Sequence, residues 1–524
     1  MMMNEDDGWH CASCQTMNGG GVCCITYNTQ RCETANGATA LSTTDSFNLD
    51  YFATACRGIS EQRVRTLVLG AADADILLTL QNIAYCRDCR GGRGERQILR
   101  WSLNALAKSS HSSHVAVNLG RFIGFGRWDD IAAFINTPLE EVMVEFVAAQ
   151  FKTDLQSLAQ QHKSSSDTPP TVSVSLLAKW FPSEHRGIAK SSGIYGKVAK
   201  QLGVDSAGMR KTYLSPLRAA IGLLETKMSR GEWDTIDFSQ LPSLALKLHS
   251  SPKGAFQKHC PETFASFKEN LATGKTKANT GQLFPHQIVQ SYYNGTVRET
   301  DELLEYAWKQ QVERAKQLGT LTGCVVVSDV SGSMSCAKGV PMMVSIAMGI
   351  LTAEAQPAPW GGAVITFSEK PTWHPVTGTT LCEKVRSLRN ASWGMSTNLQ
   401  AVFDLVLGKA IRAQLPPDEM PKMILIISDM QFDRACQNND ETNLRVIKEK
   451  FRQRGYVCPQ LVFWNVNGAF QNVPAKKDDE AVSLISGFSV DLLGAVMGED
   501  RKTPEETMRA ALSAERYAEL CLAE

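Results

Sequence analysis

Five short apolar runs rich in β-branched residues constrain the fold more than any other feature of the chain. They occupy residues 323–330, 361–368, 422–430, 459–466 and 481–488. Helical patterns alternate with them at 337–355, 397–414 and 440–453. Continuous apolar strands separated by helices predict a parallel sheet covered on both faces. Residues 321–500 are therefore expected to form a Rossmann-like α/β domain, and residues 501–524 a C-terminal helix.

Polar side chains follow the first of these strands at alternate positions. Asp329, Ser331 and Ser333 can aim their oxygens at one point if the segment passes from extended chain into a turn, and Gly332 permits a tight turn there. One carboxylate and two hydroxyls form a hard oxygen site suited to Mg²⁺ or Mn²⁺. The alternative interpretation is an Asp/Ser turn that caps the following helix.

Two further segments carry matching side chains. Thr397 lies in GMSTNL (394–399), just before a helical pattern, and Asp429 ends the strand in IISDMQFD (426–433). With DVSGSM (329–334), these segments resemble the metal-ion-dependent adhesion site of the von Willebrand factor A domain over about residues 321–490. The resemblance implies that Ser331, Ser333 and Thr397 bind the cation directly or through water, and that Asp329 and Asp429 hold waters or bind directly. Met430 departs from the pattern, since many members have glycine there.

The segment from 46 to 320 is mostly helical in pattern, and we expect it to form an α-helical scaffold domain. One predicted apolar helix face comprises Leu139, Val142, Met143, Phe146, Val147 and Phe151. The runs at 164–170 and 274–282 are typical of loops. No repeat of fixed period is visible, so a helical-repeat architecture would have to be degenerate.

Five arginines lie close together in CRDCRGGRGERQILR (86–100): Arg87, Arg90, Arg93, Arg96 and Arg100. If a helix begins near Gly94, Arg93, Arg96 and Arg100 project from one side of its first turns and could hold phosphate or RNA. The alternative, which we favour, is that the arginines pair with Asp88, Glu95 and neighbouring acids between packed helices.

The same stretch carries a second resemblance. RDCRGGRGER, GFGRWDD (124–130), LAKWFPSEH (177–185), RKTYLSPLR (210–218), LFPHQIV (283–289) and DVSGSM are similar to a family known as a domain of unknown function, over about residues 46–500. That family joins a helical half to a von Willebrand A-like half. In its overall architecture the chain also resembles the TROVE module of the Ro ribonucleoprotein autoantigen. That resemblance implies a HEAT-like helical domain and an RNA partner.

The first 45 residues form a cysteine-rich segment without regular periodicity. Cys11 and Cys14, in WHCASCQTMN (9–18), resemble the first half of a Ran-binding-protein-type zinc finger, a module that binds single-stranded RNA or ubiquitin. The second half departs from that pattern, because Cys23, Cys24 and Cys32 would have to complete a Zn²⁺ site. The alternative is a disordered tail with incidental cysteines.

Charge and cysteine content exclude several classes of protein. The 54 basic and 54 acidic side chains balance, so nothing global indicates nucleic acid, membrane or acidic partners. By segment the balance is −5 over 1–50, +8 over 51–320 and −3 over 321–524. No apolar run is long enough to span a bilayer, and the start of the chain has no secretory signal. Fifteen cysteines, several of them in apolar runs, indicate reduced thiols and a cytoplasmic or nuclear protein.

These features support three functional hypotheses. The first is a non-enzymatic binding protein whose cation captures a carboxylate of a protein partner. The second is an RNA-binding ribonucleoprotein component that uses the basic helical segment. The third, a metal-dependent hydrolase, needs a general base near Asp329. The one histidine after residue 321 is His374, and its surroundings, PTWHPV, predict an edge strand, so we expect no catalysis.

Overall fold

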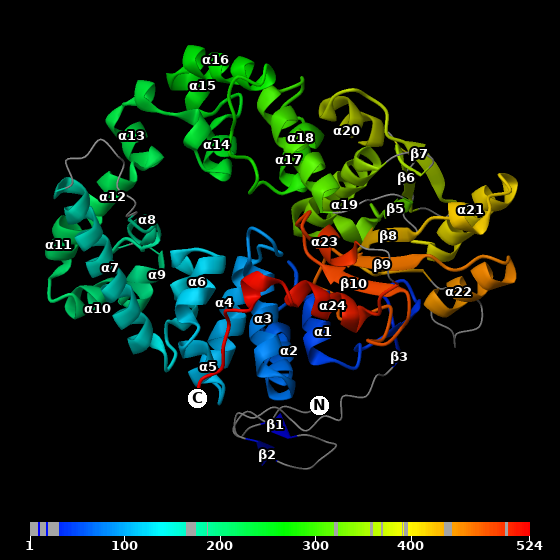
Figure 1. The fold of residues 1–524 in the computed structure, drawn as a ribbon, viewed down its shortest axis with the longest axis horizontal. Helices are drawn as coiled ribbons and strands as arrows, with labels where there is room; N and C mark the ends of the chain where they lie inside the picture. The colour runs from blue at the N-terminus through cyan, green and yellow to red at the C-terminus, as the bar shows by residue number, and fades with distance from the viewer. Residues whose placement is uncertain are drawn as a thin grey trace. The chain divides into compact units, whose positions relative to one another are not determined.

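The computed structural model describes residues 9–10, 17–18, 31–163, 174–185, 187–318, 323–356, 360–367, 370–389, 391, 397–433, 443–497 and 501–524. Contacts divide the chain into two compact units. Unit 1 comprises residues 1–86, 91–95 and 283–517, and unit 2 comprises residues 87–90, 96–282 and 518–524. Figure 1 shows the helices and strands of both units in chain order.

A six-stranded sheet forms the centre of unit 1, with the order β10-β9-β8-β5-β6-β7. Five strands are parallel, and β7 alone in this sheet runs antiparallel, beside β6. The strands are β5 (Cys324–Ser328), β6 (Ala363–Thr366), β7 (Thr372–Pro375), β8 (Met423–Ser428), β9 (Gln460–Asn465) and β10 (Val482–Ser486). The five predicted apolar runs therefore become the parallel strands, and His374 lies on an edge strand as predicted.

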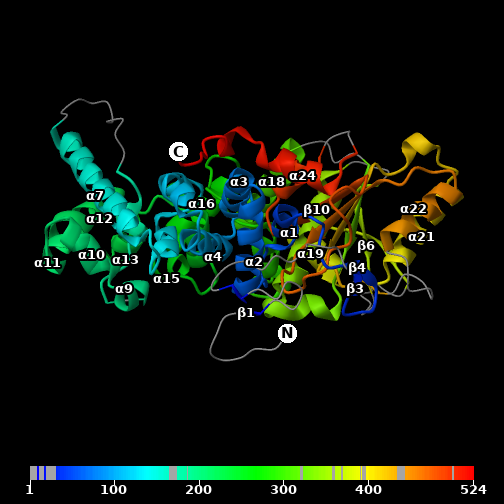
Figure 2. The same cartoon turned by 90° about the horizontal axis from the view of Figure 1, so that it is seen from below.

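Both faces of the sheet are buried, which explains why its strands are apolar without alternation. Alternate strand residues such as Val325, Val327 and Ile424 belong to one core with residues of α21 and α22. The opposite face meets α19, which contacts β5, β6 and β8, while α1 and α24 contact β10. Figure 2 shows α21 and α22 grouped beside the strands after a turn of 90°.

The helices of unit 1 come from two parts of the chain, one before and one after residues 96–282 of unit 2. They are α1 (Phe47–Thr54), α2 (Glu61–Ala74), α3 (Ile76–Arg87), α17 (Pro285–Tyr293), α18 (Glu302–Gln317), α19 (Cys336–Ala355), α20 (Leu381–Arg389), α21 (Leu399–Arg412), α22 (Asn443–Gln453), α23 (Leu492–Val496) and α24 (Pro504–Leu512). Short 3₁₀ turns are η5 (Gly332–Ser335), η6 (Pro417–Glu419) and η7 (Glu515–Tyr517). A hairpin of β3 (Arg31–Glu33) and β4 (Thr39–Leu41) precedes α1, and β1 (Trp9–His10) pairs with β2 (Met17–Asn18).

All the regular elements of unit 2 among its described residues are helices. Its helices are α4 (Arg96–Ala107), α5 (Ser112–Ala116), α6 (Leu119–Phe125), α7 (Glu140–Lys163), α8 (Leu177–Trp180), α9 (Gly187–Ser192), α10 (Ile194–Gln201), α11 (Ser206–Gly208), α12 (Ser215–Ile221), α13 (Leu224–Arg230), α14 (Ser243–His249), α15 (Ala255–His259) and α16 (Pro261–Ala272). Its 3₁₀ helices are η1 (Trp128–Phe134), η3 (Trp233–Thr235) and η4 (Phe238–Gln240), and η2 (Met209–Leu214) is a π-helix. Phenylalanine clusters such as Phe238, Phe256 and Phe264 fill its interior.

The two-part plan, a helical half followed by an α/β half, agrees with the prediction. The compact units differ from the predicted division at residue 321, because α1, α17 and α18 pack with the sheet unit although their sequence periodicity is that of the helical half. Residues 274–282 form a loop as predicted, and residues 164–170 lie outside the described residues. On α7 most of the predicted face is buried, but Val142 is 42% exposed. Among the described residues, no helix has both the length and the apolar character needed to cross a bilayer.

Candidate metal centre

Two carboxylates lie where neighbouring parallel strands end at the middle of the sheet. Asp329 follows β5 and Asp429 follows β8, and these two strands are hydrogen-bonded in register from Cys324 and Met423 onward. After β5 the chain crosses to β6 on one side, and after β8 it crosses to β9 on the other. Such a reversal of strand order opens the crevice in which α/β sheets bind ligands.

Asp329 is completely buried and its two oxygens have separate donors. Its Oδ2 accepts a hydrogen bond from Ser428 Oγ at 2.6 Å, and its Oδ1 accepts one from the Ser331 backbone N–H at 2.8 Å. Burial raises the pKa of Asp329 to about 6, and the nearby charge of Asp429 acts in the same direction. The bond from Ser331 N–H is the Asp turn of the alternative interpretation, but neither Ser331 nor Ser335 caps the following helical turns with its side chain.

Asp429 is buried and less well satisfied. Its Oδ1 accepts a hydrogen bond from Gln431 N–H at 3.2 Å, whereas its buried Oδ2 has no hydrogen-bond partner among the described residues. Burial raises the pKa of Asp429, and the side chains of Ser333 and Asn467 partly oppose that rise. Among the ion pairs of the described residues, neither Asp329 nor Asp429 has a basic partner.

The two predicted serine ligands lie together beside the carboxylates. Ser331 Oγ and Ser333 Oγ are 3.1 Å apart, and Ser333 lies in the 3₁₀ turn η5. The resulting set of two carboxylates and two hydroxyls offers only oxygen, the donor preferred by Mg²⁺ and Mn²⁺. Two buried like charges and an unsatisfied carboxylate oxygen are the environment that a divalent cation would neutralise, so the residues present fit such an ion. No group of three or more His, Cys, Asp or Glu suited to a metal occurs within the described ranges.

Thr397 is buried just before α21 and is engaged in a different network. Its Oγ1 lies 2.7 Å from the Gln431 carbonyl oxygen and 3.0 Å from Asp433 Oδ1, either of which accepts its one proton. It also accepts a hydrogen bond from Asn36 Nδ2 at 2.9 Å. Gly394, Met395 and Ser396 of the predicted motif lie outside the described residues.

Met430 is the residue at which the sequence departs from the von Willebrand pattern. Its φ is 65°, in the left-handed region that glycine adopts without strain, yet its side chain is buried in the core beneath the sheet edge. The Met430 N–H is held by Ser428 Oγ at 3.1 Å, the same hydroxyl that donates to Asp329. The turn after β8 therefore contains a left-handed residue that is not glycine. Ser428 was not predicted, although its place before Asp429 at the end of an apolar strand was a usable signal.

Known proteins resemble both halves of the chain. Residues 137–321 match a domain of unknown function (DUF2828), and residues 323–519 match a second one (DUF7788). The chain is 32% identical over 505 residues to "Uncharacterized protein L728" of Acanthamoeba polyphaga mimivirus, covering 90% of this chain and 85% of that protein. The chain belongs to the L728 family. A crystal structure of the Deinococcus radiodurans RO (RSR) protein aligns with 90% of this chain and 100% of its own, at 14% identity and a TM-score of 0.48.

The arginine segment of this L728-family protein is divided between the two units. Arg93 lies before α4, not on it, and is fully buried in unit 1, where its Nη1 donates to Phe52 O, Ala55 O and Ser486 Oγ. The expected projection of Arg93 from the same helix side as Arg96 and Arg100 is therefore wrong. The reason is that the chain turns at Gly94, with φ of 70°, before the helix begins at Arg96.

Arg87, Arg96 and Arg100 belong to unit 2 and gather around two aspartates. Arg87 pairs with Asp130 at 2.7 Å, and Arg100 pairs with both Asp129 and Asp130 at 3.1 Å. Half-exposed Arg96 also reaches Asp129, at 3.4 Å. The expected pairing with acids is thus observed for these three arginines, with Asp129 and Asp130 as the acids, while the Arg90 N–H donates to Asp88 Oδ1 at 2.9 Å.

The other candidate residues are cysteines. Cys11, Cys14, Cys23 and Cys24 lie outside the residues whose side chains are described, and Cys32, on β3, is a free thiol. Cys324 and Cys458 are buried free thiols, as predicted.

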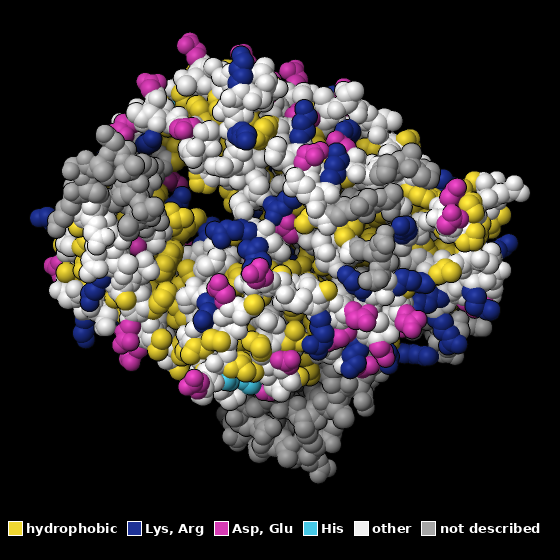
Figure 3. All heavy atoms as spheres, in the orientation of Figure 1, with side chains coloured by type: hydrophobic (Ala, Val, Ile, Leu, Met, Phe, Trp, Pro, Cys, Tyr) yellow, Lys and Arg dark blue, Asp and Glu magenta, His cyan; other side chains and the backbone are white. Residues whose placement is uncertain are grey.

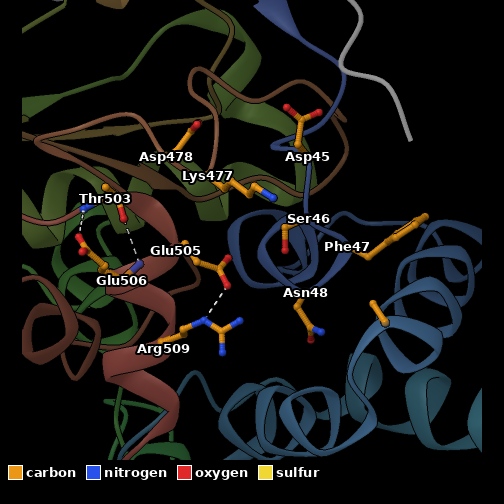
Figure 4. A pocket seen from close by; sticks show the side chains of 11 residues that line it. Asp45, Ser46, Phe47, Asn48, Lys477, Asp478, Thr503, Glu505, Glu506 and Arg509 are labelled. Atoms are coloured by element: carbon orange, nitrogen blue, oxygen red, sulfur yellow. Dashed lines mark hydrogen bonds and ion pairs between the residues drawn. The ribbon is translucent and has the colours of Figure 1, made fainter. Parts of the chain in front are cut away.

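A separate pocket of about 570 Å³ lies at the start of α24 (Figure 4). None of the metal candidates lines it, and two of its charges, Glu505 and Arg509, pair with each other at 2.8 Å.

Proposed function

We propose that this protein is a non-enzymatic, metal-dependent binding protein and that its α/β half is a von Willebrand A-like domain. A Mg²⁺ or Mn²⁺ ion at the β5–β8 edge would capture a carboxylate of a protein partner. The observation that carries the proposal is the buried pair Asp329 and Asp429, which has no basic partner among the described residues and leaves Asp429 Oδ2 unsatisfied. The strand order with one antiparallel edge strand supports the domain type.

The bound ion would supply positive charge for a partner's carboxylate. Asp329, Asp429, Ser331 and Ser333 would hold it, and the neutral hydroxyls would leave most of its charge uncompensated. Thr397 can join them only if its hydroxyl leaves the Gln431 and Asp433 network. His374 lies two strands from β5 and its Nε2 is 3.1 Å from Ser387 O, which supports binding without catalysis.

Calorimetric titration of the full chain with Mg²⁺ tests this proposal. We expect one saturable site in the wild type and its loss in Asp429→Asn, which removes one charge without changing side-chain size. Asp418→Asn is the matched control, because Asp418 is an exposed residue of η6 away from the carboxylate pair. Equal Mg²⁺ binding by wild type and Asp429→Asn would contradict the proposal.

RNA binding through unit 2 is a second candidate, favoured by the crowding around Asp129. The guanidinium groups of Arg96, Arg100 and Arg127 all reach Asp129 Oδ2, at 3.4, 3.1 and 3.0 Å. With Arg87 and Asp130 the cluster holds four positive and two negative charges, an excess suited to phosphate. Elsewhere, on the face drawn in Figure 3, basic and acidic side chains are interspersed.

Salt-dependent binding of a single-stranded RNA oligonucleotide tests this second candidate. The double change Arg96→Glu and Arg127→Glu should weaken binding at low salt and reduce its salt dependence. Arg230→Glu is the control, since Arg230 is an exposed arginine of the same unit that lies on α13. No difference between the two variants would exclude this arginine cluster as the RNA site.

A further inference from the structure

The tip of the N-terminal hairpin, residues 34–37, contacts the loop that follows β8. It joins β3 to β4 and is nearly 400 residues away from that loop in the chain. Thr34 Oγ1 donates to Phe432 O at 2.7 Å, and the Ala35 N–H donates to Gln431 Oε1 at 2.7 Å. We call Thr397 and residues 431–433 the rim. The hairpin tip is therefore held to the rim by polar contacts.

Asn36 makes the central contact between the hairpin tip and the rim. Its Nδ2 donates to Thr397 Oγ1 at 2.9 Å and to the Gln431 carbonyl oxygen at 2.8 Å. Asn36 itself is exposed, whereas Thr397 and Gln431 are buried. One exposed carboxamide thus covers the hydroxyl that the von Willebrand resemblance assigns to the cation.

The base of the hairpin is anchored independently of the tip. Leu41 and Val473 exchange two backbone hydrogen bonds of 3.0 and 2.9 Å, and Ala38 and Ala40 are buried. Main-chain pairing and apolar burial hold this base, whereas the contacts of Ala35 and Asn36 are exposed on the hairpin side. The contacts of Ala35 and Asn36 can therefore open while the base, the buried Thr34 and the bridge between Gly37 and Asp433 remain in place.

The rim also reaches the carboxylate pair. The Gln431 N–H donates to Asp429 Oδ1 at 3.2 Å, while the Gln431 carbonyl oxygen accepts from both Thr397 and Asn36. One residue therefore connects the hairpin tip, Thr397 and Asp429. A cation that draws Thr397 Oγ1 toward itself must take it from the acceptors and the donor that now hold it.

We propose that Asn36 and Ala35 of the hairpin tip form a removable plug, which holds Thr397 in the rim network and is displaced when a cation occupies the site, leaving the cation open to a partner's carboxylate. This inference rests on the proposed function and assigns its regulation to Asn36. A carboxylate cannot simply replace the Asn36 amide, because it would face the Gln431 carbonyl oxygen without a proton to donate. A bound cation would reverse that preference and favour the carboxylate over the carboxamide.

Mg²⁺ affinity of the full chain tests the plug. Asn36→Ala removes both hydrogen bonds to the rim and should tighten Mg²⁺ binding, measured by calorimetry, by roughly tenfold. Glu33→Gln is the matched control, because Glu33 is an exposed residue on strand β3 of the same hairpin, outside the tip. In the wild type, hydrogen exchange at the Ala35 N–H should accelerate when Mg²⁺ saturates the site.

The outcomes separate the plug from the proposed function. If Asn36→Ala and Glu33→Gln both bind Mg²⁺ as the wild type does, while Asp429→Asn does not bind it, the plug is overturned and the metal site stands. If Mg²⁺ binds without changing exchange at Ala35, the plug is likewise overturned. If no variant binds Mg²⁺, the proposed function fails and the plug fails with it.

Discussion

Unit 1 buries the positive charge of Arg93 and the carboxylates of Asp329 and Asp429, and their surroundings affect its stability differently. Arg93 is fully buried: its Nη1 has three acceptors and its guanidinium lies within 6 Å of the rings of Tyr51, Phe52 and Tyr85, while its Nε and Nη2 have no hydrogen-bond partner among the described residues. Asp329 and Asp429 are buried beside each other without a basic partner among the described residues. The acceptors and rings around Arg93 stabilise its charge, whereas the carboxylate pair has no such compensation and costs stability, a cost that the proposed cation would offset.

Loss of Arg93 should destabilise unit 1 strongly. Arg93→Ala leaves Phe52 O, Ala55 O and Ser486 Oγ with one donor fewer and opens a cavity, so we expect the free energy of unfolding to fall by about 3 kcal/mol or more. Urea denaturation measures this change. Arg452→Ala, which removes an exposed partner of Glu449, should leave the urea midpoint nearly unchanged. Equal effects of the two changes would contradict the structural role of Arg93.

The raised pKa of Asp329 predicts a pH dependence with a definite sign. A carboxyl group whose pKa is higher in the folded than in the unfolded state binds protons on folding, so the metal-free protein loses stability as the pH rises from about 4 to about 6. The loss is complete above pH 6 and corresponds to about 3 kcal/mol. The measurement is urea unfolding of wild type and Asp329→Asn in chelator at pH 4.5 and 7.5.

The difference between those two proteins isolates Asp329 from other titrating groups. Wild type should lose stability relative to Asp329→Asn as the pH rises. A gain of stability by the wild type over the same range would show that the two donors to Asp329 outweigh its burial and the nearby charge of Asp429, contrary to the raised pKa.

Some of these residues could be placed from the sequence and others could not. Asp329 and Asp429 end apolar strands, so the parallel sheet alone brings them to one edge. Arg93 shares its local sequence with four other arginines, and only the distant acceptors Phe52 O and Ser486 Oγ decide that it is buried. Asn36 offers no local signal at all, because its partners lie about 360 residues or more further along the chain.

At the scale of elements, α19 fixes the strand that carries Asp329. Gly349 of α19 lies so close to β5 that a Cβ atom there would be 2.4 Å from Ser328 Oγ and 3.3 Å from Val364 Cγ1. Ser328 precedes Asp329 directly and donates to Ser345 O on the same helix at 3.3 Å. The close approach of helix and strand therefore positions the end of β5.

Gly349→Ala should destabilise the protein although alanine favours helix. The added methyl group must push α19 away from β5, and we expect a cost of about 1–3 kcal/mol, typical of overpacking. The control is Gly408→Ala on α21, where the nearest atoms belong to the flexible side chain of Arg412 at 3.4 Å or more. This control should be neutral or slightly stabilising. Thermal unfolding of both variants distinguishes packing from helix propensity.

The same elements show which part of the fold periodicity can predict. The five apolar runs form five parallel strands, because a strand that is covered on both faces of the sheet is apolar at every position and can be recognised without knowing its neighbours. The strand β7 was expected only as an edge, from His374 between prolines, and its antiparallel direction follows from the short connection to β6. The helical pattern predicted for 46–320 includes α17 and α18, but it could not show that they pack on α19, because an apolar helix face carries no information about which element covers it.

At the scale of the whole molecule, the two compact units are not consecutive in sequence. The chain passes between them after residues 86, 90, 95, 282 and 517. The boundary between the two matching domains of unknown function, at 321–323, falls inside unit 1. A cut at that point separates the sheet from α1, α17 and α18, which belong to the same unit.

A fragment of residues 321–524 should therefore fail to fold as the full chain does. It retains all six strands and both aspartates, but it exposes the surface of α19 that α17 and α18 cover and the surface of β10 that α1 covers. Fully buried side chains such as Trp308 of α18 and Phe52 of α1 fill those surfaces in the intact unit. Burying such an aromatic side chain is worth about 3 kcal/mol or more, a large share of the stability of a domain of this size.

Near-ultraviolet circular dichroism and urea unfolding of the fragment measure this expectation. We expect weak tertiary signal, a shallow transition and a tendency to aggregate, since large apolar surfaces are left uncovered. A fragment of residues 283–517 with residues 31–95 supplied as a separate chain restores the described elements of unit 1 from β3 onward and should recover a cooperative transition. If residues 321–524 alone unfold cooperatively at the urea midpoint of the full chain, then α1, α17 and α18 are not needed for the sheet to fold. The sheet edge that carries Asp329 and Asp429 would then form without them.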